Sequence, residues 1–278
     1  ANTTGADNTA VGKAALGANT TGAHNTAFGK ATLQANTTGT SNTTVGSESL
    51  LANTTGANNV AVGKSALVVN TTGAGNTALG LETLQANTTA NYNTAVGFQA
   101  LALNTTGTYD TASGYRALFN NTTGSYNAAF GRLSLEANTT GTENTAIGNG
   151  ALYLNTTGAN NTAVGSSALD SNTTGYECTG IGVAALTANT TGAHNTAVGR
   201  NAGKTITSGG ANTFVGHNTN GSSVTVDYAA GLGYNLTCAG FYTTLGYSSV
   251  DSRLNHGTTT WATVSDERYK KDITTSTA

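Results

Sequence analysis

Three tyrosines at a constant spacing in the chain, Tyr92, Tyr109 and Tyr126, are the side chains of this sequence best suited to recognising a ligand. On adjacent coils of a stacked sheet their rings would lie about 4.8 Å apart. Aromatic faces with polar rims suit sugar rings, so a carbohydrate-contacting patch is one hypothesis. The preferred interpretation is a tyrosine ladder that only stabilises exposed strands. Other aromatic residues in the same part of the chain are Phe98, Tyr115 and Phe119.

Residue types that catalyse reactions or bind metals are otherwise scattered. No pair of carboxylates recurs, and the acidic residues lack the spacing of a calcium loop. Cys178 and Cys238 form neither a disulfide framework nor a metal-ligand pattern. The sequence therefore predicts no enzyme acting on an outside substrate, no metal site and no cofactor. The isolated histidines are His24, His194, His217 and His256.

The elements that position the tyrosines come from one repeated sequence. Residues 18–34 read Ala-Asn-Thr-Thr-Gly-Ala-His-Asn-Thr-Ala-Phe-Gly-Lys-Ala-Thr-Leu-Gln, and the pattern begins again at Ala35 and in every later repeat. The glycine of the Val-Gly step keeps this period from Gly12 to Gly216, and Gly233 is still in phase. Two glycines per repeat indicate corners with positive φ, and the segments between them are too short for helices. The pattern predicts an all-β parallel β-solenoid with one coil per repeat.

In such a stack each repeat position becomes a column of like residues. The columns that run from Val11 to Val215 and from Leu16 to Leu186 are expected to form the core, and the column that begins at Asn8 is expected to form a hydrogen-bonded asparagine ladder. Two apolar columns make a thin core, and the small alanine column that begins at Ala10 is expected to face outward. Other copies of the chain would bury that column, so we expect a homotrimer, wound or packed around a common axis. Ser113 interrupts the column that begins at Val11, and Asp110 and Cys178 interrupt the asparagine column.

Composition limits the functions that this chain of 278 residues can have. The formal net charge of −2 gives no basic footprint, which argues against nucleic-acid binding. No apolar run approaches the roughly 20 residues of a membrane helix, so this segment is not expected to insert into a membrane. Because the chain opens in mid-motif without Met, we expect it to be a fragment.

The recurring Asn-Thr-Thr has two further interpretations. Each copy is a glycosylation sequon, although Asn and Thr also favour tight corners through local hydrogen bonds, which is the preferred interpretation. The paired threonines also form regular columns, which raises an ice-binding function as the least favoured hypothesis.

Two sequences, Asn25-Thr26-Ala27-Phe28-Gly29 and the stretch from Asn161 to Ala168, resemble the head repeats of trimeric autotransporter adhesins. The resemblance covers residues 1–216 and implies a trimeric left-handed parallel β-roll on a cell or particle surface. The 17-residue period with its Asn-Thr-Thr-Gly insert is longer than the repeat of that family.

The repeat erodes towards the C-terminus. Residues 217–264 are expected to form a β-rich neck or cap, with Val224–Tyr228 as an alternating strand. Residues 265–278 begin Ser-Asp-Glu-Arg-Tyr-Lys-Lys-Asp-Ile, which is similar to the start of the endosialidase-type intramolecular chaperone domain of phage tail fibres. The resemblance implies that Ser265 is a self-cleaving nucleophile and Lys270 its partner, provided that a full chaperone domain is present. The alternative is a solvated charged tail.

Together these features predict an extracellular, homotrimeric fibre shaft, on a virion tail or a cell surface, that provides reach and attachment to a host. The expected structure is a phage or phage-like tail fibre, and the expected external partner is a cell-surface glycan or another surface receptor. The alternative is a bacterial trimeric surface adhesin.

Overall fold

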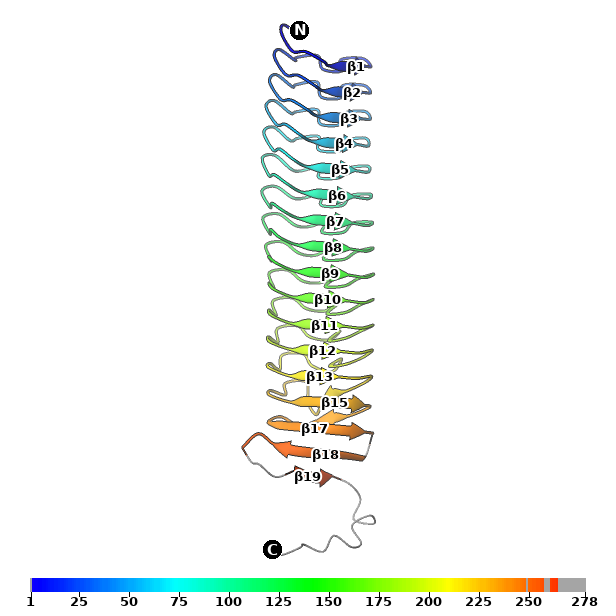
Figure 1. Ribbon diagram of the computed structural model, residues 1–278, viewed down its shortest axis with the longest axis vertical. Coiled ribbons are helices and arrows are strands. Elements are labelled where there is room, and N and C mark those ends of the chain that lie inside the picture. The colour runs from blue at the N-terminus through cyan, green and yellow to red at the C-terminus, as the bar shows by residue number, and fades with distance from the viewer. Residues whose placement is uncertain (1, 249, 258–260, 265–278) are drawn as a thin grey trace, which may run out of the picture.

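The computed structural model describes residues 2–248, 250–257 and 261–264, and these residues form strands, turns and connecting segments without any helix. The chain winds into a rod of stacked coils with one short strand on the same side of each coil (Figure 1). The predicted all-β parallel β-solenoid is therefore confirmed. The strands are β1 Thr9–Val11, β2 Thr26–Phe28, β3 Thr43–Val45, β4 Val60–Val62, β5 Thr77–Leu79, β6 Thr94–Val96, β7 Thr111–Ser113, β8 Ala128–Phe130, β9 Thr145–Ile147, β10 Thr162–Val164, β11 Thr179–Ile181, β12 Thr196–Val198, β13 Thr213–Val215, β14 Asn220–Gly221, β15 Ala230–Tyr234, β16 Thr237–Cys238, β17 Tyr242–Tyr247, β18 Val250–Asn255 and β19 Trp261–Val264.

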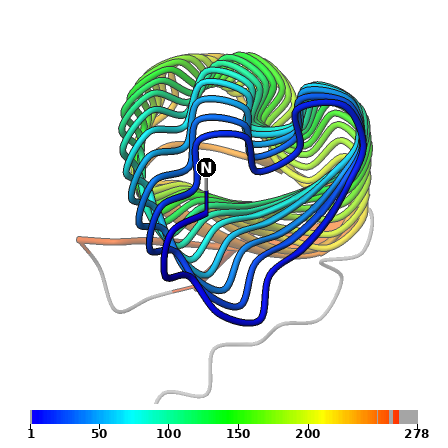
Figure 2. The same ribbon diagram turned by 90° about the horizontal axis from the view of Figure 1, so that it is seen from above.

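One parallel sheet runs the length of the rod. Strands β1 to β13 pair in register, each residue opposite the residue one repeat later, and β15 and β17 continue the same sheet. The last coil is shorter, because Ala230 pairs with Thr243 rather than with a residue one full repeat later. Strands β18 and β19 then add to the sheet in antiparallel orientation. Seen along the axis, successive coils stack on one another with a gradual offset (Figure 2).

The orientation of the three-residue strands reverses the expected core. The central alanine points inward, as at Ala27, which is 1% exposed, whereas Phe28 points outward and is 57% exposed. The prediction that the Val11 column is core and the Ala10 column faces outward is therefore wrong, and so is the argument that the alanine column is kept small for a partner. The physical reason is alternation along a strand: Thr and Val flank the same alanine and must share a face, so burying Val would also bury the threonine.

Two residue columns thus cover the outer face of the sheet. We call the first the outer aliphatic column; it consists of Val11, Phe28, Val45, Val62, Leu79, Val96, Ser113, Phe130, Ile147, Val164, Ile181, Val198, Val215, Leu232 and Leu245. We call the second the outer threonine column; it consists of Thr9, Thr26, Thr43, Val60, Thr77, Thr94, Thr111, Ala128, Thr145, Thr162, Thr179, Thr196, Thr213, Ala230 and Thr243.

The interior is narrow and is filled by leucine and alanine. The predicted leucine column is confirmed as core, with every member from Leu33 to Leu186 fully buried. One coil shows that the side-chain volumes of the leucine and alanine columns are matched. Gly203 stands there at the leucine position and Phe214 at the facing alanine position. A Cβ on Gly203 would lie 3.1 Å from Cδ2 of Phe214. The buried phenylalanine ring therefore takes the volume that leucine fills in other coils.

Two asparagine ladders, rather than one, line the interior. The predicted ladder is confirmed: Asn42 donates its backbone N–H to Oδ1 of Asn25 at 3.0 Å and its side-chain Nδ2 to the carbonyl of Gly56 at 2.9 Å. The second ladder uses the Asn of Asn-Thr-Thr, where Asn36 donates Nδ2 to Oδ1 of Asn19 at 2.8 Å. These side chains are buried from Asn19 to Asn189. Their burial supports the corner interpretation of the sequons, because an attached glycan would have to replace the ladder.

The two glycine columns have different roles. Glycines of the Val-Gly step have positive φ, as predicted, for example +132° at Gly12. The glycines of Asn-Thr-Thr-Gly do not, and they are needed for close approach instead: a Cβ on Gly141 would lie 2.4 Å from the carbonyl oxygen of Gly158 in the next coil. The other left-handed corners carry ordinary residues, including Leu16 at φ 50° and Ala14 at φ 62°.

Near the C-terminal end, the predicted strand Val224–Tyr228 is wrong. These residues form a turn and a corner that bonds to the preceding coil, where Thr207 donates its N–H to the carbonyl of Val224 at 2.8 Å. Val226 is buried there. The strands in this region are β14 to β19 instead.

Candidate functional site

The three tyrosines form a continuous stack on the corner that precedes β6, β7 and β8. The ring centroids of Tyr92 and Tyr109 are 5.2 Å apart with planes at 20°, and those of Tyr109 and Tyr126 are 5.2 Å apart with planes at 5°. The stack inferred from their spacing is therefore present. The three tyrosine residues are 58%, 50% and 60% exposed, respectively, so the ladder offers its edges to solvent.

The backbone at these tyrosines is left-handed. Their φ values are 60°, 59° and 61°, which for bulky residues costs about 1–2 kcal/mol each. The same corner carries a left-handed residue in other coils, such as His24 at φ 59°, so the coil geometry imposes it. Ring stacking contributes about 0.5–1.5 kcal/mol per pair and offsets part of this cost.

Gly75 leaves room for the first ring of the stack. It occupies the same corner one coil before Tyr92, with φ +68°. A Cβ at this position would lie 2.8 Å from Cδ1 of Tyr92, so the ring leans over the glycine. The stack therefore begins on a surface without a side chain.

The remaining aromatic residues of these coils belong to a separate ladder. Phe98 stacks on Tyr115 at a centroid distance of 5.6 Å, in the column that follows the strand rather than the one that precedes it. Phe119 lies under the guanidinium of Arg116, whose Cζ is 4.1 Å from the ring centroid. The strands therefore separate the two aromatic ladders.

An ion pair beside Phe119 was not visible from the period of the sequence. Arg116 Nη2 lies 2.8 Å from Oε1 of Glu136, and these side chains are 31% and 10% exposed. The charge of Glu136 and its hydrogen bond to Tyr153 raise the pKa of that phenol. Arg116 and Glu136 occupy different positions of the repeat, so no column linked them. The ion pair uses Nη2 of Arg116, whereas its buried Nε has no hydrogen-bond partner.

A shallow hollow lies further along the corner that carries the tyrosine stack. It has a volume of about 210 Å³ and opens where Gly210 and Ala211 leave space between His194 and Tyr228. His194 Nδ1 lies 3.1 Å from Oε2 of Glu177, and the tyrosine ring packs against Phe241 with centroids 5.2 Å apart. Asp227 also lines the hollow, and its Oδ1 accepts the N–H of Gly210.

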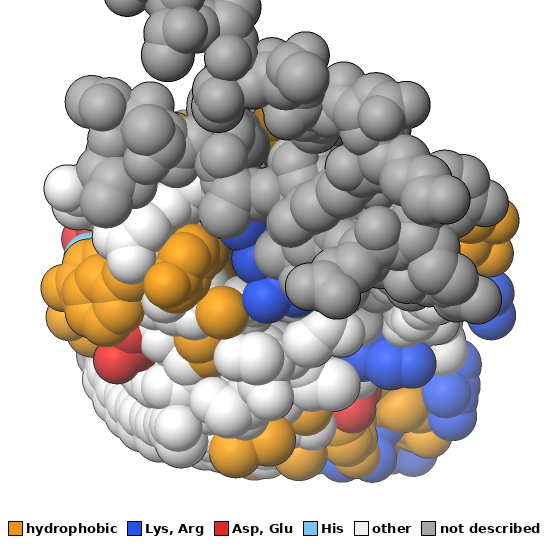
Figure 3. Space-filling view, turned by 90° about the horizontal axis from the view of Figure 1, so that it is seen from below, with side chains coloured by type: hydrophobic (Ala, Val, Ile, Leu, Met, Phe, Trp, Pro, Cys, Tyr) orange, Lys and Arg blue, Asp and Glu red, His pale blue; other side chains and the backbone are white. Residues whose placement is uncertain are grey.

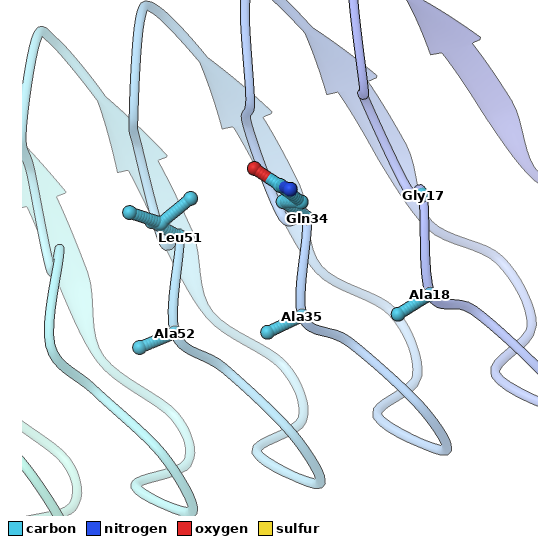
Figure 4. A pocket seen from close by; sticks show the side chains of 6 residues that line it. All are labelled: Gly17, Ala18, Gln34, Ala35, Leu51 and Ala52. Carbon is cyan, nitrogen blue, oxygen red and sulfur yellow. The ribbon is translucent and has the colours of Figure 1, made fainter.

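A second, open hollow of about 690 Å³ lies near the N-terminal end and is lined by alanines and the residues before them. Figure 4 shows the alanines in a row on successive coils. The lining offers one amide side chain and otherwise small or apolar groups, so nothing there resembles a catalytic arrangement. The lining residues are Gly17, Ala18, Gln34, Ala35, Leu51 and Ala52.

Residues with catalytic or metal-binding potential stay apart. No group of three or more His, Cys, Asp or Glu side chains suited to a metal ion is found in the part of the chain that the structure describes. Cys178 and Cys238 are buried and free, and burial raises the pKa of each thiol to about 11. Ser265 and Lys270 lie outside the described residues.

The charged side chains leave the outer face of the sheet uncovered. Seen from below, the described surface shows orange apolar groups and blue basic groups among white polar surface, with the two kinds next to each other at the lower right (Figure 3). Basic residues such as Lys13, Lys30 and Lys64 stand in the column just beyond the outer aliphatic column. The outer face itself contains no charged residue.

Within the described residues there is no helix long and apolar enough to cross a membrane. Comparisons of this chain with family models, with curated proteins and with solved structures give no match.

Proposed function

We propose that this chain is the shaft of an extracellular fibre, a phage or phage-like tail fibre made of three copies, which provides reach and attaches to a host surface. The observation that supports this most directly is the unbroken parallel sheet from β1 to β17. Fifteen strand rows at about 4.8 Å per row give a rod of about 70 Å. Such a structure separates its two ends rigidly, as a spacer requires.

Attachment is assigned to the tyrosine stack. The three parallel rings stack face to face and therefore present a strip of apolar ring edges and hydroxyl groups, which can contact the apolar faces and polar rims of sugar rings. We therefore propose a cell-surface glycan as the ligand. The self-cleavage implied for Ser265 and Lys270 stays a prediction, as does the bacterial adhesin alternative.

The attachment proposal is tested by replacing Tyr92, Tyr109 and Tyr126 with alanine together. The expected result is at least a tenfold loss of binding to a glycan array or to host cells, because each stacked ring supplies about 1 kcal/mol of contact. The matched control replaces Phe98 and Tyr115 with alanine, because they are a stacked pair on the other side of the strands. Unchanged binding by the triple variant, with circular dichroism showing an intact fold, contradicts the proposal.

The shaft proposal is tested by mass. A chain of 27.6 kDa in a three-copy fibre should migrate at about three times that mass in SDS without boiling. Electron microscopy of the native protein should show rods rather than compact particles. Chains found only as monomers at all concentrations would contradict the three-copy shaft.

A further inference from the structure

The outer face of the sheet has the properties of a buried surface although it is open to solvent. Phe28, Leu79 and Ile147 in the outer aliphatic column are 57%, 46% and 42% exposed. Monomeric proteins rarely leave a continuous apolar strip of this kind uncovered. The strip also continues past the regular repeats, through Leu232 and Leu245, which pair in register in β15 and β17.

No charged residue interrupts this face. The outer aliphatic and outer threonine columns contain only apolar residues, threonine and one serine, Ser113, whereas the chain as a whole has 24 charged residues if Lys and Arg are added to Asp and Glu. Depletion of charge is typical of the centre of protein interfaces. The nearest basic residues, such as Lys64, stand just beyond the face, where the rim of an interface would lie.

The size of the face fits a stable interface. Fifteen rows extend about 70 Å, and a three-residue strand is about 10 Å wide, which gives an area on the order of 700 Å². A stable two-body interface buries about 800 Å² on each partner, and in a three-copy arrangement the face is the total area that one chain buries against its two neighbours. A single column at the edge of the sheet would not reach this area.

The spacing of residues along the outer face determines which partner can cover it. Both columns repeat once per coil along the whole rod, so only a partner with the same spacing and length can cover every row. A second copy of this chain, placed parallel about a common axis, meets that condition coil by coil. A globular partner would cover a few rows and leave the rest exposed.

We infer that the outer aliphatic and outer threonine columns form the surface through which copies of this chain associate, side by side and parallel, around the fibre axis. The inference rests on the proposed three-copy shaft and assigns its contact to a face. Ordered water is a less suitable occupant, because the outer aliphatic column mixes Val, Phe, Leu and Ser and therefore lacks the regular surface that lattice matching requires.

The test compares two double variants that carry the same added charge on the same two coils. Ile147→Lys with Ile181→Lys places lysines on the face, and Thr140→Lys with Thr174→Lys places them at the exposed Asn-Thr-Thr corner. Multi-angle light scattering should give about three times 27.6 kDa for the wild type and the corner variant and 27.6 kDa for the face variant. Circular dichroism checks that each variant is folded, and Ile147→Thr with Ile181→Thr provides a milder change, expected to weaken association at least tenfold.

The possible outcomes separate the claims. A trimeric wild type with a trimeric, folded face variant overturns the assignment of the face and leaves the three-copy shaft standing. A monomeric wild type overturns both. A monomeric wild type that shows thermal hysteresis, abolished in the face variant alone, identifies the face as an ice-binding surface and also overturns the inference.

Discussion

Asp110 occupies a position that asparagine fills in the neighbouring coils. Its Oδ1 accepts the N–H of Asn127 at 2.8 Å, and its Oδ2 accepts Nδ2 of Asn121 at 3.2 Å. Neighbouring ladder members such as Asn93 also donate Nδ2 to a glycine carbonyl of the next coil, a bond for which an ionised Asp110 has no proton. Burial accordingly raises the pKa of this carboxyl to about 7.

The pH dependence of stability follows from that shift. The folded pKa lies above the unfolded value of 3.8, so the contribution of Asp110 is fully present below about pH 4 and is lost as pH rises to about 7. We expect Asp110→Asn to raise the stability at pH 8 by up to about 4 kcal/mol and to change it little at pH 4. Thermal midpoints of both proteins from pH 4 to pH 8 measure this. Parallel pH profiles for the wild type and the variant would refute it.

At the scale of one coil, contact with the next coil decides which residues are allowed. The glycine of Asn-Thr-Thr-Gly lies so close to its counterpart that a single methyl group cannot fit. Gly141→Ala would place Cβ 2.4 Å from the carbonyl of Gly158 and 2.4 Å from Oδ1 of Asn138. The coils must then separate locally and break ladder bonds.

We expect Gly141→Ala to destabilise the fold by about 3 kcal/mol or more, because it forces a backbone shift and frees buried polar groups. Gly17→Ala is the matched control, since its Cβ would meet nothing closer than 3.4 Å. It should change stability by less than about 0.5 kcal/mol. Urea unfolding followed by circular dichroism compares the two, and equal effects would contradict the close-approach explanation.

The sequence was sufficient for the coil but not for the direction in which its strand faces. The constant period, the leucine column and the Asn8 column predict the solenoid, its core and one ladder, because each is a property of spacing. Hydrophobicity alone suggested that valine lies inside and alanine outside. Alternation along the strand reverses this, because the threonine and the valine that flank each alanine share a face. A second signal was the pairing of Gly203 with Phe214, where a large residue enters the alanine column and the leucine is missing.

The candidate site was predictable in the same partial way. The stack of Tyr92, Tyr109 and Tyr126 follows from the period, and the structure contains it. The contact of Arg116 with Glu136 does not follow from the period, because the corners bring together residues that occupy different positions of the repeat in neighbouring coils. The left-handed φ at leucine and tyrosine was equally out of reach, since the intrinsic preferences of these residues oppose it and the geometry of the coil imposes it.

For the whole molecule, a repeat in which each coil contacts only its neighbours should tolerate removal of complete coils. Deleting residues 145–178 removes two complete coils and joins Asn144 to Thr179 in phase. The shortened protein should fold, with a rod about 10 Å shorter by small-angle X-ray scattering. Deleting residues 145–170 ends out of phase and is expected to disrupt the downstream coils. If the out-of-phase variant were fully folded, the view of coils as interchangeable units would be refuted.

The hydrogen bonds between coils have one further consequence. Backbone bonds such as that from Gly148 to Phe130, together with both asparagine ladders, point along the rod rather than across it. A pull on the two ends therefore loads all the bonds between a pair of coils together, and the rod is as strong as its weakest pair. The coil that carries Asp110, whose ionised side chain lacks a donor, is where we expect tension to open the rod first, and more readily in alkaline than in acidic surroundings.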